Sequence, residues 1–597
     1  MAPMPTEPPL PGSHDSDDLN RRRTAEPMLR PPHDFSRYYS CATRRRVASS
    51  VKDFYKYFAI PGIHNLAGGL PHVSYFPFDS LEATVALPNR IPKDGFVPQP
   101  QPTASPASPP ASQRVVVPKE SSVDDGLRRI DLATALQYGA VDGYPPLRSF
   151  IRQFVRENLH PHVPYEGGPE VILTCGATDG FSKTIEAFTN VWDENRDWIR
   201  ERQGLLCEEF AYMTAIQTAR PRGLNIVPVA VDSQGMKVEG ERGLADVLDN
   251  WDFSRGQRPH LMYTVTIGQN PTGAVLPLER RRQIYKLCQR YDIIIIEDDP
   301  YWHLQYPSAK QNALRQGQSD SSPHTPFSVH DEPSGFPFLD SLVKSYLSID
   351  TAGRVVRLDT FSKIIAPGCR LGWLTAQPDI VERILRISET STQQPSGFVQ
   401  SMVAKLIMGD QADDMVKKPC TEGSPGWRVD GWVRWLEGLR GGYEKRMQTM
   451  CTILEEGRFS IVQGDALSND SNLDEWQVVD NVQMFDFDWP GAGMFVWVKF
   501  CLETHPLWSQ VPAAKLANAL WKYLINAPYR VIVGPGWLFA PTEDVKKYAW
   551  RYMRLCFAPV DEGAVATSSH NFIEGCRSFW QVKDIHDIDD LEDDNEE

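Results

Sequence analysis

The 597-residue sequence lacks several patterns that would assign it to a common class of protein. It has no apolar run approaching the ~20 residues that a helix needs to cross a bilayer, so no membrane partner is expected. Its ten cysteines include no Cys-x-x-Cys pair, which argues against a metal site and favours reduced thiols. The N-terminus has no apolar core of a secretory signal. Together these absences predict a cytoplasmic protein without a bound metal.

The sequence also lacks an excess of basic residues. Its formal net charge is -15, and nine of the fourteen residues 584–597 are Asp or Glu. General binding of nucleic acid requires a basic surface, so no nucleic-acid partner is expected. A dense acidic run is usually a solvated tail, and we expect one at the C-terminus.

Hydrophobic residues, at 41% of the chain, are abundant enough for packed cores, and a chain of this length predicts two or more domains. Several stretches interrupt this pattern because they are polar or rich in proline and serine. We interpret them as a flexible N-terminal arm, two surface inserts and a further polar break. They cover residues 1–50, 98–118, 307–335 and 410–428.

Between these breaks, predicted strands alternate with predicted helices. The continuous β-branched run at 292–297 is typical of a strand that is buried on both faces of a mostly parallel sheet. The alternation predicts an α/β domain, in which ligands bind at the carboxyl ends of the strands. The predicted strands are 171–174, 261–265, 292–297, 354–358 and 371–376.

Four loops after these strands contain residues suited to chemistry. Gly176 opens a helix whose free N–H groups suit a phosphate, and Asn270 lies in an Asn-Pro-Thr-Gly run, although simple turns explain both. Asp298 ends an apolar strand and needs a partner such as a protonated ring nitrogen, a helix N-terminus or an arginine. Lys363 is either a desolvated amine nucleophile or an ordinary surface lysine. Arg370, seven residues on, has the planar fork that suits phosphate.

In order and spacing, these four loops resemble those of fold-type I pyridoxal-phosphate (PLP) enzymes of the class I/II aminotransferase family. The chain most resembles the branch of fungal aromatic amino acid and kynurenine/2-aminoadipate aminotransferases. This resemblance implies an α/β large domain with a mostly parallel seven-stranded sheet and a small α+β C-terminal domain. The expected divisions are an arm at 1–50, an N-terminal segment at 51–134, the large domain at 135–395, the small domain at 396–575 and an acidic tail at 576–597.

The resemblance also implies roles for individual residues. Lys363 matches the lysine that links covalently to PLP, and Asp298 matches the aspartate that pairs with the pyridinium nitrogen. Arg554 matches the arginine that binds the substrate α-carboxylate, for which its bidentate geometry is suited. The other matches are Asn270 and Tyr301 at the ring 3'-oxygen, Tyr212 stacked on the ring, Ala177, Thr178, Thr360, Ser362 and Arg370 at the phosphate, Gly69 and Asn270 beside the substrate, and Tyr138 at the phosphate of a neighbouring subunit.

The implied protein is a homodimer with shared active sites. The implied reaction is ping-pong transfer of the amino group of a bulky L-amino acid (Tyr, Phe, Trp, kynurenine or 2-aminoadipate) to a 2-oxo acid such as 2-oxoglutarate. Because a fold does not determine a reaction, a PLP lyase, decarboxylase or synthase remains the alternative. A transcription regulator on this fold would need a winged-helix domain, and the Pro-rich arm before residue 50 is too short for one.

Overall fold

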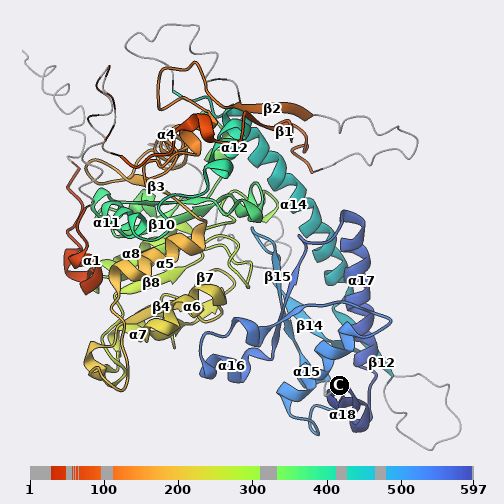
Figure 1. Ribbon diagram of the computed structural model, residues 1–597. Helices are drawn as coiled ribbons and strands as arrows, with labels where there is room; N and C mark the ends of the chain where they lie inside the picture. The colour runs from red at the N-terminus through yellow and green to blue at the C-terminus, as the bar shows by residue number, and fades with distance from the viewer. Residues whose placement is uncertain are drawn as a thin grey trace, which may run out of the picture.

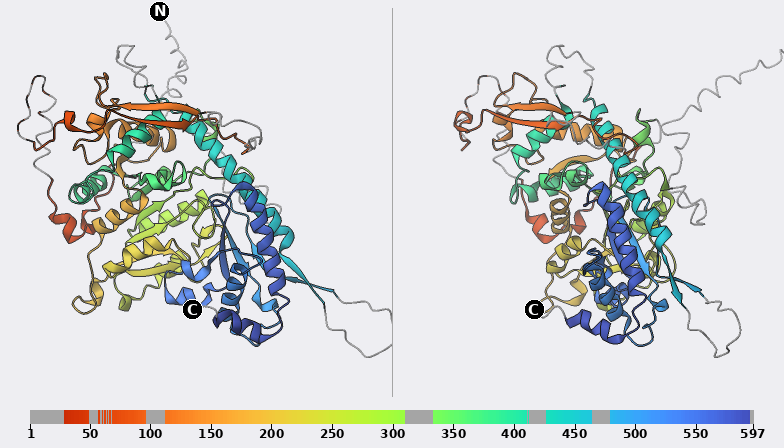
Figure 2. Two further views of the ribbon diagram at one scale, coloured as in Figure 1. Left: turned by 45° about the vertical axis from the view of Figure 1, so that its right-hand side comes forward. Right: turned by 90° about the vertical axis from the view of Figure 1, so that its right-hand side faces the viewer.

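The computed structural model describes residues 29–48, 57, 60, 62, 64, 66, 68–95, 112–309, 333–409, 411, 426–463 and 479–593. Two bodies, each with its own apolar core, are joined by the long helix α14 (Asp430–Gly457), which runs from one to the other (Figures 1 and 2). The larger body is formed mainly by residues before α14, and the smaller body by the residues after it.

The larger body is built on a seven-stranded sheet with the strand order β3-β11-β10-β9-β8-β4-β5. Within this sheet β11 is antiparallel to both of its neighbours, and the other strands run parallel to one another. The expected mostly parallel seven-stranded sheet is therefore confirmed; β4 and β5 are additions to the five strands predicted. The strands are β3 (Glu170–Thr174), β4 (Gly204–Glu208), β5 (Asn225–Val229), β8 (Leu261–Thr264), β9 (Ile294–Asp298), β10 (Val355–Thr360) and β11 (Gly372–Ala376).

Helices cover both faces of this sheet, which explains the continuous apolar run of β9. Ile294 and Ile296 pack among residues of α5, α6 and α11, whereas Ile293 and Ile295 pack on the opposite face, among residues of α7 and α8. All four isoleucines are fully buried. The helices of this body are α1 (Cys41–Arg45), α3 (Leu132–Ala135), α4 (Pro145–Gln153), α5 (Ala177–Phe188), α6 (Met213–Ala219), α7 (Leu244–Asp249), α8 (Leu278–Arg290), α10 (Pro337–Asp340), α11 (Pro378–Glu389) and α12 (Gly397–Met408).

A hairpin of β1 (Ser80–Ala86) and β2 (Ser112–Pro118) lies across the top of the larger body (Figure 1). The strand β2 belongs to the segment 98–118 that the sequence predicts as a low-complexity insert, so the last part of that segment is not a linker. The reason is its valine run, in which Val115 and Val117 are buried. The proline-rich residues 96–111 lie outside the described residues.

The smaller body contains a four-stranded sheet in the order β14-β15-β17-β16, with a separate ribbon of β12 and β13. Its α-helices pack against this sheet around a second core. Its elements are β12 (Phe459–Gln463), β13 (Val479–Gln483), β14 (Phe485–Phe487), β15 (Phe495–Phe500), β16 (Gly534–Pro535), β17 (Tyr552–Cys556), α15 (Ala513–Ile525), α16 (Glu543–Ala549), α17 (Glu562–Phe579) and α18 (Ile585–Asp593).

The expected boundary at residue 395 differs from the packing. Val403 of α12 and Leu436 in the first half of α14 belong to the core of the larger body. Met447 and Leu454 in the second half of α14 belong to the core of the smaller body. A helix of 28 residues is about 42 Å long at 1.5 Å per residue, which is longer than one core needs. The division between the two bodies therefore falls within α14.

The described part of the N-terminal arm is packed rather than flexible. Phe35 and Tyr39 are buried against the α5 side of the sheet, and the Tyr38 hydroxyl donates a hydrogen bond to Asp292 at 2.8 Å. These aromatic side chains explain the difference, because each anchors a short segment without needing a core of its own. Residues 1–28 lie outside the described residues.

The expected acidic tail is also largely folded. Helix α17 crosses the predicted boundary at residue 575, and α18 packs on α15 through the fully buried Ile588. Lys515 of α15 pairs with Asp589 at 2.7 Å. An apolar residue recurs every three positions in α18, and this stripe is the signal that the count of acidic residues concealed. Residues 594–597 lie outside the described residues.

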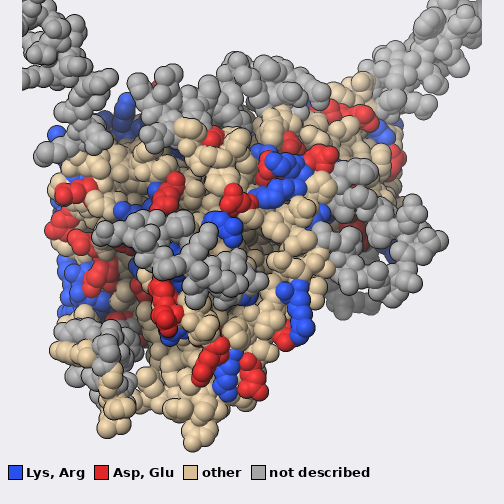
Figure 3. Space-filling model, turned by 90° about the horizontal axis from the view of Figure 1, so that it is seen from above, with Lys and Arg blue, Asp and Glu red and all other residues tan. Residues whose placement is uncertain are grey.

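Across the described residues, no helix combines the length and apolarity that membrane crossing requires. On the face of the molecule seen from above, acidic and basic side chains are interspersed rather than gathered by sign (Figure 3). Among the same residues, no group of three or more His, Cys, Asp or Glu is arranged to hold a metal.

Candidate active site

The candidate active site lies at one edge of the large sheet, where the predicted loops begin. The strands β3, β8, β9 and β10 run parallel, so their carboxyl ends meet at the same edge. The register pairs Gly372 of β11 with Thr360 on one side and Thr174 on the other. The loops that follow β3 and β10 are therefore neighbours.

Asp298 ends β9 with its carboxylate enclosed by protein, at 7% exposure. Its Oδ2 accepts a hydrogen bond from the Tyr263 hydroxyl at 2.9 Å, while its Oδ1 is buried with no hydrogen-bond partner among the described residues. Burial raises the pKa of Asp298 to about 7. A buried acceptor without a donor is costly, so this oxygen marks the place of a missing donor.

Lys363 lies at the end of the short 3-10 helix η9 (Phe361–Lys363), directly after β10. Its ammonium is half-buried, and its Nζ is 6.0 Å from the centre of the Tyr301 ring. Burial lowers the pKa of Lys363; nearby Cys556 opposes this shift, whereas the positive charges of Arg554 and Arg370 add to it. A lysine with a lowered pKa is a competent amine nucleophile. The alternative, an ordinary surface lysine, would not have its pKa lowered by burial.

The predicted phosphate residues gather where α5 begins. Gly176 has a φ of 94°, and a Cβ added to it would stand 3.0 Å from Nη2 of Arg370, so the glycine lets the guanidinium lie close to the helix N-terminus. The Thr360 hydroxyl donates to Oγ of Ser362 at 2.9 Å. Ala177 and Thr178 form the first turn of α5, where N–H groups are free of helical partners. Backbone donors, hydroxyls and one arginine are suited to a phosphate group.

Arg554 of β17 reaches this edge from the smaller body. Its Nη1 donates a hydrogen bond to Oδ1 of Asn270 at 2.7 Å, and its Nε is buried with no hydrogen-bond partner among the described residues. The guanidinium carbon is 4.4 Å from the ring centre of Phe495 and 4.6 Å from that of Phe539. Burial lowers the pKa of Arg554. A cation held between two rings, with donors left over, is suited to binding a carboxylate.

The four remaining predicted residues fall into two groups. Tyr301 is buried and packs edge-on against Phe495, with ring centres 5.6 Å apart, and Tyr212 precedes α6 at 36% exposure. Tyr138 is 60% exposed, and Gly69 is exposed with open space around it. Within one chain, the last two are not brought into contact with Lys363 or Asp298.

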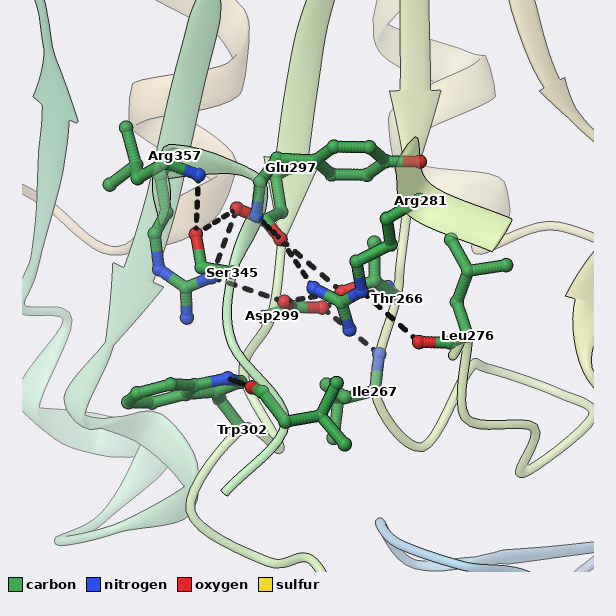
Figure 4. A network of polar contacts seen from close by, with 12 residues as sticks. Thr266, Ile267, Leu276, Arg281, Glu297, Asp299, Trp302, Ser345 and Arg357 are labelled. Atoms are coloured by element: carbon green, nitrogen blue, oxygen red, sulfur yellow. Dashed lines mark hydrogen bonds and ion pairs between the residues drawn. The ribbon is translucent and has the colours of Figure 1, made fainter. Parts of the chain in front are cut away.

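A buried ion cluster lies on the opposite side of the same strand ends (Figure 4). Arg357 pairs with Glu297, Asp299 and Asp359 at 3.0 to 3.1 Å, and Arg281 pairs with Glu297 at 3.0 Å. Neither arginine is exposed to solvent, and the three carboxylates are nearly or fully buried. Sequence analysis missed these residues, together with Tyr263, Phe495 and Phe539. The available signal for the cluster was that Glu297 and Asp299 flank Asp298, because neighbours in a strand point to opposite faces.

These features satisfy the requirements of PLP. The free oxygen of Asp298 can accept a hydrogen bond from a protonated ring nitrogen, and the Lys363 amine can attach to an aldehyde. The N-terminus of α5 and Arg370 can together bind a dianionic phosphate. The fold and the site together define the class of fold-type I PLP enzymes.

Comparison with known proteins identifies the family within this class. Residues 116–566 match the family "aminotransferase class I and II", and the chain belongs to that family. It is 34% identical over 429 residues to an aromatic amino acid aminotransferase of Schizosaccharomyces pombe, covering 70% of this chain and 77% of that protein. It is 32% identical to the L-tyrosine:2-oxoglutarate aminotransferase of Tapinella panuoides, covering 79% of this chain and 75% of that protein.

A solved structure supports the same assignment. The crystal structure of aminotransferase Aro8 from Candida albicans superposes with a TM-score of 0.70 at 29% identity, covering 93% of this chain and all of that one (100%). The predicted family, fold and reaction class are therefore confirmed: the chain is an aminotransferase, and its family implies PLP.

Proposed function

We propose that this aminotransferase uses PLP to transfer the amino group of an aromatic or other bulky L-amino acid to a 2-oxo acid such as 2-oxoglutarate. Relatives named for aromatic amino acids and for L-tyrosine with 2-oxoglutarate support this substrate class. The observation that carries the proposal is the buried, unpartnered Oδ1 of Asp298 at the end of β9. Such an atom is tolerated where a ligand supplies the donor.

The roles of the residues that would hold the cofactor follow from the resemblance of their loops to those of the family. Lys363 provides the amine that attaches PLP, and Asp298 pairs with its ring nitrogen. Asn270 and Tyr301 bind the ring 3'-oxygen, and Tyr212 covers the ring. Ala177, Thr178, Thr360, Ser362 and Arg370 bind the phosphate.

The chemistry then follows from the side chains of this chain. Bound PLP supplies an electron sink, which makes the Cα–H bond of the substrate acidic. Asp298 stabilises the proton on the ring nitrogen, without which that sink is weaker. Once the substrate's amino group has displaced it from PLP, the amine of Lys363, whose pKa is lowered by burial, would take the Cα proton as a general base. Arg554 and Asn270 would hold the substrate α-carboxylate. This would orient the substrate so that its Cα–H bond stands across the ring plane, and the bond in that orientation is the one that breaks.

The surroundings of Arg554 favour a bulky apolar substrate. Phe495 and Phe539 flank its guanidinium, and Tyr301 packs against Phe495. A substrate whose carboxylate binds Arg554 therefore lies among aromatic rings, which pack well against another aromatic side chain.

The exposed positions of Tyr138 and Gly69 fit an active site completed by a second copy of the chain. We propose that the protein is a homodimer in which Tyr138 contacts the phosphate bound in the neighbouring subunit. We also propose that the protein is located in the cytoplasm. Analytical ultracentrifugation checks the first point: a dimer is expected, and a fully active monomer would contradict it. Fluorescence imaging of the tagged chain checks the location: a cytoplasmic signal is expected, and a signal confined to an organelle would contradict it.

The decisive experiment is a half-reaction without any 2-oxo acid. The purified PLP-loaded protein is mixed with single amino acids in a stopped-flow spectrometer, and the cofactor absorbance is followed. Tyrosine, phenylalanine or tryptophan should convert it fully to the pyridoxamine form, whereas Lys363→Ala should not complete the conversion. Release of CO₂ or of an elimination product instead would assign the chain to a PLP lyase or decarboxylase.

A further inference from the structure

Tyr263 is the one residue that donates a hydrogen bond to the carboxylate of Asp298 among the described residues. It lies on β8, which pairs with β9 so that Tyr263 stands opposite Ile296. Since residues two apart in a strand share a face, Asp298 is on the same face as Ile296 and Tyr263. The strand register therefore brings the phenol and the carboxylate together.

The ring of Tyr263 is held rigidly. Its side chain is fully buried, and Phe181 of α5 packs edge-on against it with ring centres 5.0 Å apart and planes at 68°. A ring in such packing has little freedom to move its hydroxyl. The hydrogen bond to Oδ2 of Asp298, at 2.9 Å, therefore fixes the plane of that carboxylate.

A fixed carboxylate plane determines which oxygen is available. With Oδ2 bound to Tyr263, Oδ1 is the atom left without a donor. Burial has the largest effect on the pKa of Asp298 and raises it; the charges of Asp299 and Asp359 also raise this pKa, and that of Arg357 lowers it. The Tyr263 hydroxyl acts against that burial by stabilising the ionised form.

A tyrosine is suited to this position because it remains a donor. Burial raises the pKa of Tyr263 well above its ordinary value, so its hydroxyl keeps its proton throughout the working pH range. A histidine in the same place would change its protonation near neutral pH.

We propose that Tyr263 is a positioning residue of this aminotransferase, which orients Asp298 so that Oδ1 meets the ring nitrogen of PLP. It acts through Asp298 and does not touch the substrate. The inference rests on the proposed use of PLP. It adds a residue that acts on the ring nitrogen indirectly, by orienting the Asp298 carboxylate.

The test compares two tyrosines that differ in location. Tyr263→Phe removes the hydroxyl that reaches Asp298. Tyr285→Phe is the matched control, because its hydroxyl donates to another buried carboxylate, Asp350, at 2.9 Å, on the α8 side of the sheet. Both variants lose one buried phenol–carboxylate hydrogen bond, and Tyr285→Phe also removes an acceptor of the Ala352 N–H at 3.2 Å, so both should be destabilised.

Two readouts separate positioning from simple packing. Tyr263→Phe should weaken PLP binding by the protein roughly 10-fold or more, measured by equilibrium dialysis, because a hydrogen bond to a charged group is lost. It should lower kcat more than it changes KM, and it should raise the pH midpoint of the absorbance change of bound PLP. Tyr285→Phe should leave all of these at wild-type values.

A double variant keeps the test sharp if Tyr263→Phe is unstable. In the Asp298→Asn background, adding Tyr263→Phe should change PLP affinity less than it does in the wild type, because both substitutions act on one contact. If both tyrosine variants lose stability equally and leave PLP affinity and the absorbance spectrum unchanged, the positioning role of Tyr263 is overturned. The proposed function would be unaffected by that result. Wild-type protein that binds no PLP would overturn the proposed function and, with it, this role.

Discussion

Asp298 and Asp299 are adjacent and both buried, but their carboxylates differ in how many hydrogen bonds they accept. Asp299 accepts hydrogen bonds from the N–H and hydroxyl of Thr266, from the N–H of Ile267 and from Arg357, at 2.6 to 3.1 Å. Asp298 accepts one, from Tyr263, and its Oδ1 has no donor among the described residues. Consecutive strand residues point to opposite faces, so one face of β9 holds a satisfied carboxylate and the other an incomplete one.

The difference shows how to separate structure from function in a buried polar group. A carboxylate whose two oxygens both accept hydrogen bonds from arginine, hydroxyl or backbone donors serves the fold. A carboxylate left with a free oxygen costs stability, and that cost is tolerated where a ligand completes the site. The ion cluster around Asp299 thus holds the strand ends together, and Asp298 is the group that we propose for PLP.

The largest expected effect comes from breaking the cluster at its centre. Arg357→Leu leaves Glu297, Asp299 and Asp359 buried with too little positive charge, which should cost about 3–5 kcal/mol of unfolding free energy. Denaturant unfolding monitored by circular dichroism measures this. The control Arg282→Leu removes an exposed pair with Glu279 and should change stability by less than about 1 kcal/mol. A folded Arg357→Leu protein of wild-type stability would remove the structural role of the cluster.

The next effect is on catalysis at Asp298. Asp298→Asn should lower kcat about 10²–10³-fold, the scale of losing one preorganised electrostatic contact at a reacting centre. The protein without PLP should remain folded, because the substitution removes an uncompensated buried carboxylate. Steady-state kinetics with tyrosine and 2-oxoglutarate provide the measurement. Activity within a few-fold of wild type would show that Asp298 is not the partner of the ring nitrogen.

The same substitution should change the pH dependence of stability. Burial raises the pKa of Asp298 from 3.8 to about 7, so between these values the folded state binds a proton that the unfolded state has lost. Stability of the PLP-free protein therefore falls as pH rises through this window. The advantage of Asp298→Asn over wild type should be near zero below about pH 4 and reach on the order of 2–4 kcal/mol above pH 7. A difference that does not vary with pH would contradict the shift.

A smaller effect on stability should follow from removing one hydrogen-bond donor of Asp299. Thr266→Val removes one hydroxyl donor to Asp299, and three donors remain, so we expect a loss of about 1–2 kcal/mol. PLP affinity should stay at the wild-type value. Thr218→Val is the control, because that hydroxyl is bonded to a carbonyl of its own helix at 2.8 Å. A large loss of PLP affinity in Thr266→Val would mean that the two faces are not separate.

Much of the large domain could be predicted from the sequence because its signals are local. Residues 293–296, in the region of β9, are all isoleucine, and such a continuous apolar run is characteristic of a strand covered on both faces. Asp298 ends β9, Lys363 and Asn270 lie in the segments that follow β10 and β8, and parallel strands bring their ends together. Their role in binding PLP came from resemblance rather than from spacing.

The remainder depends on contacts that sequence patterns do not encode. The pairing of Tyr263 with Asp298 requires the register of two strands, and the position of Arg554 between Phe495 and Phe539 requires the second body to be placed. The described N-terminal residues and the acidic end were expected to be mobile because polarity dominated their composition. A few apolar anchors, such as Tyr39 and Ile588, were enough to order both.

The most direct test of the account is the thermal midpoint of Asp298→Asn and Asp299→Asn, each measured with and without PLP at pH 8. We predict that Asp298→Asn keeps or raises the midpoint of the PLP-free protein and loses most of the increase that PLP gives the wild type. Asp299→Asn should lower the PLP-free midpoint and keep that increase. The reverse result, with PLP stabilisation lost in Asp299→Asn and kept in Asp298→Asn, would contradict the assignment of Asp298 to the cofactor.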